Sequence, residues 1–132
     1  MTEIGDLIAI AREDPTTENL EQMWRKVFAL PAWYMLPASE GPTTPLVARL
    51  DDGDWIVAFT HFRPLNAFAR ERGLRDEAGE IPMLALSPVE SMRRLAEVTA
   101  HVSGLVFNLG TDLAFRAPHD ALDDFSARFL PR

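Results

Sequence analysis

Four polar side chains stand where predicted strands end, and their types could bind an anion or assist a reaction. Thr60 and His61 follow one predicted strand and precede a predicted helix, with Arg63 close behind. Asn108 follows a second apolar run. A hydroxyl, an imidazole, a guanidinium and an amide at strand ends could line a small polar pocket, in which the helix N-terminus attracts an anion. An anion sensor or an enzyme is therefore one candidate function.

The same residues also have a structural interpretation, which we favour. Thr60 or His61 could cap the following helix, and one histidine without a paired acid or nucleophile is a weak catalytic signal. The run from Asn108 to Thr111 has the composition of a turn, because Asn and Gly accept positive φ. We therefore assign no catalytic residue and expect a binding role rather than an enzymatic one.

A metal site is not expected from the acidic region near the C-terminus. The side chains that could suggest one are His101, His119, Asp120, Asp123 and Asp124. Their spacing matches no metal motif, and carboxylates in a first helical turn commonly offset the helix dipole. The sequence also lacks a phosphate-binding loop, a dinucleotide fingerprint and a nucleophile elbow. We expect neither a metal nor another cofactor.

Composition and charge exclude several classes of partner. The 132 residues include 13 Lys and Arg against 20 Asp and Glu, which gives a net charge of -7. A chain this acidic lacks the basic surface that nucleic acids require and is repelled by anionic lipid. It has no cysteine, no signal-peptide pattern and no apolar run long enough to span a membrane. We expect a cytoplasmic protein with neither a nucleic-acid nor a membrane partner.

The elements that must position these residues are arranged around a predicted hairpin at residues 46–59. Two apolar runs flank an Asp-Gly pair, and we place Asp52 and Gly53 at the centre of the turn. This register sets three apolar pairs opposite each other: Leu50 and Trp55, Ala48 and Val57, Leu46 and Phe59. Their face is predicted to be the core side. The register also sets Asp51 opposite Asp54, which is unfavourable.

The remaining periodicity predicts an α+β fold. Helices are expected over 3–13, over 18–29 with Thr17 as N-cap, from Pro64 to Gly73, after a capping box at Ser87, and from Pro118 onward. Strands besides the hairpin are expected over 33–36, 81–86, 105–109 and 113–117. Strands and helices alternate only in part, so residues 1–132 should form one domain with a mixed sheet and helices packed against it.

Four segments, taken in order, carry a resemblance to a known family. They are a helix ending in Glu13-Asp14-Pro15, an aromatic strand from Trp33 to Pro37, an Asp-Gly hairpin leading into Phe59-Thr60-His61, and a strand ending in Asn108-Leu109-Gly110. Over most of residues 4–117 the chain resembles the SseB N-terminal domain family. It departs from the family pattern at His61, where serine is common, and at Leu109, where proline is common. The resemblance implies a small α+β domain without an established catalytic activity.

Three functions therefore stay open. The leading one is a non-catalytic binding or regulatory domain of the SseB-like type. The second is the anion sensor or enzyme that uses Thr60, His61, Arg63 and Asn108. The third is a type III secretion-associated adaptor, a role with which the family is often labelled.

A homodimer or a protein partner is also expected. The strand at 33–36 carries residue types that are enriched at interfaces and has no visible edge protection. Either the N-terminal helices cover this strand, or it forms part of a homodimer contact.

Overall fold

The computed structural model describes residues 4–36, 46–74, 83–97 and 102–129, and within them five helices and six strands follow the predicted order. The helices are α1 (Ile4–Glu13), α2 (Thr17–Ala29), α3 (Phe62–Arg72), α4 (Pro88–Glu97) and α5 (His119–Phe129). The strands are β1 (Trp33–Met35), β2 (Val47–Leu50), β3 (Gly53–Phe59), β4 (Leu84–Leu86), β5 (Gly104–Phe107) and β6 (Phe115–Pro118). The fold is α+β with a mixed sheet, as predicted.

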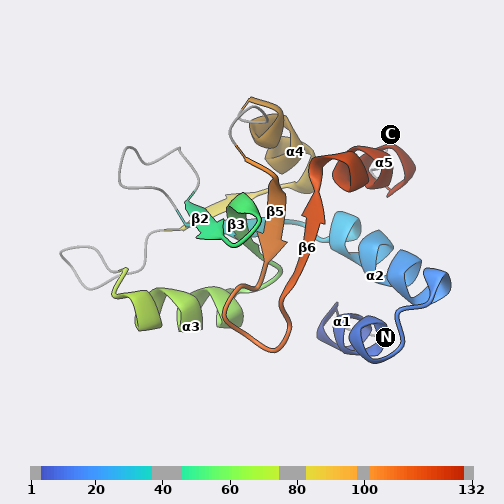
Figure 1. Ribbon diagram of the computed structural model, residues 1–132, viewed down its shortest axis with the longest axis horizontal. Coiled ribbons are helices and arrows are strands. Elements are labelled where there is room, and N and C mark those ends of the chain that lie inside the picture. Colours follow the sequence, from blue (N-terminus) through green and yellow to red (C-terminus); the bar gives the residue numbers. More distant parts are fainter. Residues whose placement is uncertain (1–3, 37–45, 75–82, 98–101, 130–132) are drawn as a thin grey trace.

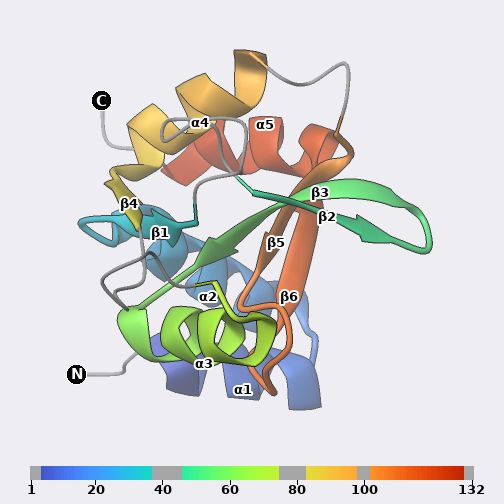
Figure 2. The same cartoon turned by 90° about the vertical axis from the view of Figure 1, so that its left-hand side faces the viewer.

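Strand β3 is the central strand of the sheet. β5 runs parallel to it on one side, and both β1 and β2 run antiparallel to it on the other. β2 pairs with the first part of β3 and β1 with its end, so the two short strands lie end to end. A backbone hydrogen bond of 2.8 Å from Leu46 N to Leu36 O joins them. β6 pairs outside β5 (Figure 1), and β4 pairs outside β1 (Figure 2).

Helices cover both faces of this sheet. α1, α2, α4 and α5 contribute side chains to one core cluster, which includes Ile56 and Ala58 of β3. α3 packs on the opposite face over Trp55, Val57 and Phe59, and Figure 2 shows α3 in front of the sheet with α2 behind it. The sequence predicted only the Trp55 face as core. That prediction was incomplete, because a central strand with helices on both sides buries both sets of its alternating side chains.

The hairpin register differs from the predicted one by two residues. Arg49 lies opposite Asp54, which places Asp51 and Asp52 at the tip. The predicted register would have opposed two carboxylates, whereas the observed one joins Arg49 Nε to Asp54 Oδ1 at 3.1 Å. Gly53 follows the tip with a φ of 136°, a value that favours glycine. Because the shift is even, every side chain keeps its predicted face.

Helix starts were predicted less accurately than helix ends. Thr16, rather than Thr17, is the N-cap of α2, and its hydroxyl accepts a backbone hydrogen bond of 3.2 Å. α3 begins at Phe62, two residues before the predicted Pro64. Gly73 ends α3 in the left-handed conformation, as predicted. The predicted N-cap of α2 was wrong by one residue. Thr16 and Thr17 have the same side chain, so residue type does not show which of them caps the helix.

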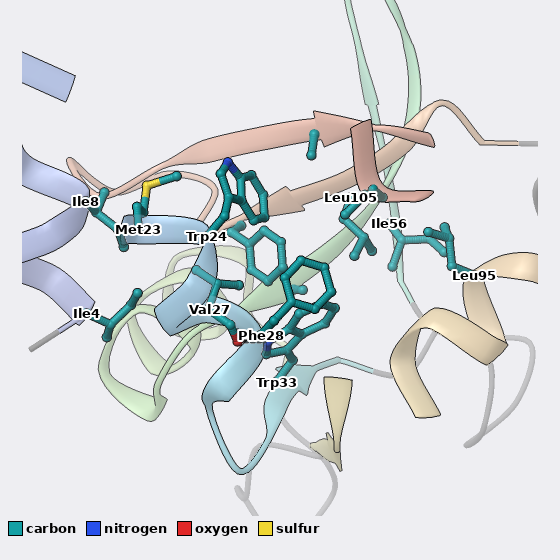
Figure 3. Close-up of a cluster of buried hydrophobic side chains, with 14 of the residues drawn as sticks. Ile4, Ile8, Met23, Trp24, Val27, Phe28, Trp33, Ile56, Leu95 and Leu105 are labelled. Atoms are coloured by element: carbon teal, nitrogen blue, oxygen red, sulfur yellow. Dashed lines mark hydrogen bonds between the residues drawn. The ribbon is translucent and has the colours of Figure 1, made fainter. Parts of the chain in front are cut away.

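The strand predicted to be open to a partner, β1, is not an edge strand. It lies between β3 and β4, and both Trp33 and Met35 are buried. Trp33 Nε1 donates to Val27 O at 2.8 Å, and its ring packs edge-on against Phe28 with centroids 5.2 Å apart (Figure 3). The helix α2 therefore covers this strand, which is the first of the two predicted alternatives. A homodimer contact would need another surface.

Some predicted features lie outside the described residues. They are the loop 38–45, the polar loop 75–80, the first residues of the predicted strand 81–86, and His101. One half of the predicted capping box of α4 is confirmed, because Glu90 N donates to Ser87 Oγ at 3.2 Å, whereas the Glu90 carboxylate pairs with Arg93 and Arg94. In the described part of the chain, no helix has the length and hydropathy that a bilayer span requires.

Replacing Gly104 tests the close approach of β5 and β6. An added Cβ would lie 2.2 Å from Ala117 O, at a φ of 157°. Gly104→Ala is therefore expected to cost about 3 kcal/mol, from backbone strain and a displaced strand. Gly73→Ala is the matched control, because its φ is also positive but nothing lies within 4 Å, and it should cost about 1–2 kcal/mol. Urea denaturation of both variants checks this; equal losses would contradict the close approach.

Candidate functional site

The predicted site residues Thr60 and Asn108 meet at one end of the sheet. Because β3 and β5 are parallel neighbours, their C-terminal ends lie together, and Thr60 and Asn108 each follow directly after such an end. Asn108 Oδ1 accepts from Thr60 N at 3.0 Å, and Asn108 Nδ2 donates to Thr60 Oγ1 at 3.2 Å. Their exposed fractions are 3% and 0%. The two residues thus form a buried, reciprocal hydrogen-bonded pair.

Asn108 also shapes the loop that leads to β6. Its φ is 56°, a left-handed conformation that Asn tolerates better than most residues. Its Nδ2 donates to Leu113 O at 3.3 Å, and its own carbonyl accepts from Thr111 Oγ1 at 2.7 Å. The prediction of a turn at Asn108 is confirmed. The side chain adds a role that the sequence did not reveal, because it ties this turn to the end of β3.

The half-buried His61 contacts this pair through Thr60. His61 Nδ1 lies 2.8 Å from Thr60 Oγ1. Because that hydroxyl already accepts from Asn108 Nδ2, the geometry fits an O–H that donates to Nδ1. Of the two residues predicted to cap α3, Thr60 and His61, it is His61 that occupies the N-cap position, but its side chain makes no capping hydrogen bond to the helix. Arg63, the fourth predicted site residue, is exposed on the first turn of α3.

The buried pair of Thr60 and Asn108 has a structural role, because it joins the ends of β3 and β5. A hydroxyl beside an imidazole is the pairing that activates a nucleophile, but here the amide of Asn108 bonds to the hydroxyl of Thr60. Thr60 is buried, so its hydroxyl is not accessible to a substrate. In the described residues, no buried side-chain nitrogen or oxygen lacks a hydrogen-bond partner. The buried polar groups of Thr60 and Asn108 therefore have their hydrogen-bond partners within the protein.

An apolar pocket lies beside the same loop, and we call it the loop pocket. Its volume is about 260 Å³, and its lining residues are Leu50, Val106, Leu109, Ala114, Phe115 and Arg116. Leu109 and Ala114 belong to the turn that Asn108 holds in place. The hydrogen bonds of Thr60 and Asn108 therefore support one wall of the loop pocket.

A three-residue cluster stands at the rim of the loop pocket. Asp52 Oδ1 accepts from Arg116 Nη1 at 2.9 Å and from Trp55 Nε1 at 3.1 Å. The Arg116 guanidinium also lies over the Trp55 ring, 5.1 Å from its centroid. Sequence reasoning missed this cluster, because Asp52 and Arg116 are 64 positions apart and Asp52 was considered only as a turn residue.

The acidic region of α5 holds no metal-binding arrangement. Of the residues considered, His101 lies outside the described part, and His119 Nε2 lies 2.7 Å from Val102 O. Within the described ranges, no three His, Asp or Glu side chains are placed to share one ion.

Substituting Asn108 separates its hydrogen bonds from its backbone conformation. Asn108→Ala should lower the free energy of unfolding by about 3 kcal/mol, because Thr60 N–H loses its buried acceptor and alanine must take a positive φ. Asn108→Gly removes the same hydrogen bonds without the backbone strain, so its cost should be about 1–2 kcal/mol smaller. Chemical denaturation measures both; a glycine variant no more stable than the alanine variant would contradict this assignment.

Comparison with known proteins identifies neither a family nor a function for this chain. No family model, no curated protein and no solved structure matches the chain. The SseB-like resemblance therefore stays a prediction from sequence, and a function must be inferred from the arrangement of this chain's own residues.

Proposed function

We propose that this chain is a non-catalytic binding domain of the SseB-like type, which acts in the cytoplasm. Its binding surface is the loop pocket, and the occupant is an apolar side chain of a second copy of the chain. One observation carries this proposal. Thr60 and Asn108, at this end of the sheet, are buried and bonded to each other, whereas the pocket beside them is apolar.

The lining of the loop pocket favours an apolar occupant over a charged one. Arg116 is the one charged residue among its lining, and its guanidinium is already paired with Asp52 and stacked on Trp55. A charged substrate would compete with that pair. An inserted Leu- or Met-sized side chain would gain about 1.5–3 kcal/mol from burial.

The other two candidate functions have weaker support. An anion sensor or enzyme would use Thr60 and Asn108, but both are buried and bonded to each other, and of the four candidates Arg63 is the exposed one. A secretion-associated adaptor rests on the resemblance alone. A binding domain with a protein partner needs neither an accessible nucleophile nor a cofactor.

Filling the loop pocket tests the self-association. Ala114→Trp should occupy the pocket and weaken the dimer at least about tenfold, which corresponds to about 1.4 kcal/mol. Because each copy carries a net charge of -7, the wild-type dimer should also strengthen as salt screens the repulsion. Light scattering over a concentration series, at low and high salt, measures both effects.

Ala127→Trp is the matched control, because Ala127 is exposed on α5 and does not line the loop pocket. It should leave the association unchanged. A wild-type chain that stays monomeric at every concentration would overturn the self-association, and equal effects of the two tryptophans would overturn the assignment of the pocket.

A further inference from the structure

A second pocket lies between α1 and α2, and we call it the helix pocket. Its volume is about 360 Å³, and it is lined by Leu7, Gln22, Arg25, Lys26 and Ala29. It shares no lining residue with the loop pocket. Its size falls at the small end of the range for small-molecule sites, about 300–1,000 Å³.

Four of these residues come from one face of α2. Positions 22, 25, 26 and 29 follow the three-four spacing of a helix, so their side chains project on the same side. The neighbouring stripe of α2, which includes Met23, Val27 and Phe28, is buried in the core. The helix pocket therefore presents an amide and two cations on a helix that the core holds in place.

The two cations lack carboxylate partners in the part of the chain that the structure describes. The ion pairs in that part involve Arg49, Arg93, Arg94, Arg116 and Arg128, and neither Arg25 nor Lys26. The chain as a whole carries a net charge of -7, so these two cations form a local exception to its acidic character. Two adjacent unneutralised cations beside an apolar surface raise the local concentration of anions.

The aromatic end of α5 restrains the Arg25 guanidinium. Its Cζ lies 5.2 Å from the centroid of the Phe129 ring, and Arg128 lies over the same ring at 4.9 Å. Arg128 in turn pairs with Glu21, which keeps that carboxylate engaged one turn before Arg25. Restraining a side chain before binding reduces the entropy that the ligand must overcome.

We propose that the helix pocket binds a small carboxylate with an apolar tail. The carboxylate oxygens would accept from Lys26 Nζ and the Gln22 amide, the nearby charge of Arg25 would add to the attraction, and the tail would pack on Leu7 and Ala29. The charge selects the carboxylate and the apolar floor selects the tail. This site is independent of the self-association proposed for the loop pocket.

Titration calorimetry with three probes separates the contribution of the ligand's charge from that of its buried alkyl tail. Octanoate carries both features, 1-octanol lacks the charge, and acetate lacks the tail. We expect octanoate to bind with an affinity at least about tenfold higher than either control, because a hydrogen bond to a charged group and the burial of an alkyl chain each contribute that much. Equal affinities for octanoate and octanol, or for octanoate and acetate, would overturn the proposal.

Variants locate the site. Lys26→Met keeps the apolar stem and should weaken octanoate binding about tenfold, whereas Lys26→Arg should retain most of the affinity. Arg70→Gln is the control, because it removes an exposed cation from α3 without touching the helix pocket. Thermal unfolding without ligand confirms that each variant folds. Affinity that survives Lys26→Met, or that falls in the loop-pocket variant Ala114→Trp, would place the ligand elsewhere and overturn the proposal.

Discussion

The packing of one aromatic ring, that of Phe107, holds three strands against the helices on one face of the sheet. The ring stacks on Phe115 of β6 with centroids 4.9 Å apart and meets Trp33 of β1 edge-on at 5.1 Å. It also lies 6.1 Å from Trp24 of α2, which itself stacks on Phe125 of α5 at 4.7 Å. Each such pair contributes about 0.5–1.5 kcal/mol beyond its buried area. Strands from both halves of the sheet and two helices therefore depend on the same cluster.

The position of Phe107 also fixes the hydrogen-bonded pair of Thr60 and Asn108 at the end of the sheet. Phe107 is the last residue of β5, so the packing that fixes its ring also fixes the backbone of Asn108 immediately after it. Asn108 N then donates to Ala58 O at 2.9 Å, which brings the amide side chain to Thr60. The buried polar pair is thus positioned by an apolar contact one residue away. This explains how a left-handed residue can be held rigidly at the end of a strand.

Sequence patterns predicted the elements well because those patterns are local. Three local signals were confirmed: the N-cap hydrogen bond of Ser87, the glycine at position 73 and the helical stripe of α2. Each acts within a few residues. The hairpin faces were also correct, because alternation survives an even change of register. The predicted register was wrong. The Asp-Gly pair favoured a turn centred on Asp52 and Gly53, whereas the observed register places Arg49 opposite Asp54.

The site was harder to predict because its contacts are distant in sequence. Thr60 and Asn108 were both named, yet their direct bonding spans 48 positions and depends on the parallel pairing of β3 with β5. The rim cluster of Asp52 and Arg116 was not named at all. No short-range pattern marks such pairs, so their roles became visible with the topology.

The junction of β1 and β2 is a place where the chain can accept inserted residues at a low cost in stability. The backbone hydrogen bond from Leu46 to Leu36 brings the two ends of the intervening sequence to the same place on β3. Chain-closure entropy grows only with the logarithm of segment length, so doubling the number of residues between these points would cost about 0.6 kcal/mol. Insertions at this junction could therefore add new surface while the paired strands on either side keep their partners.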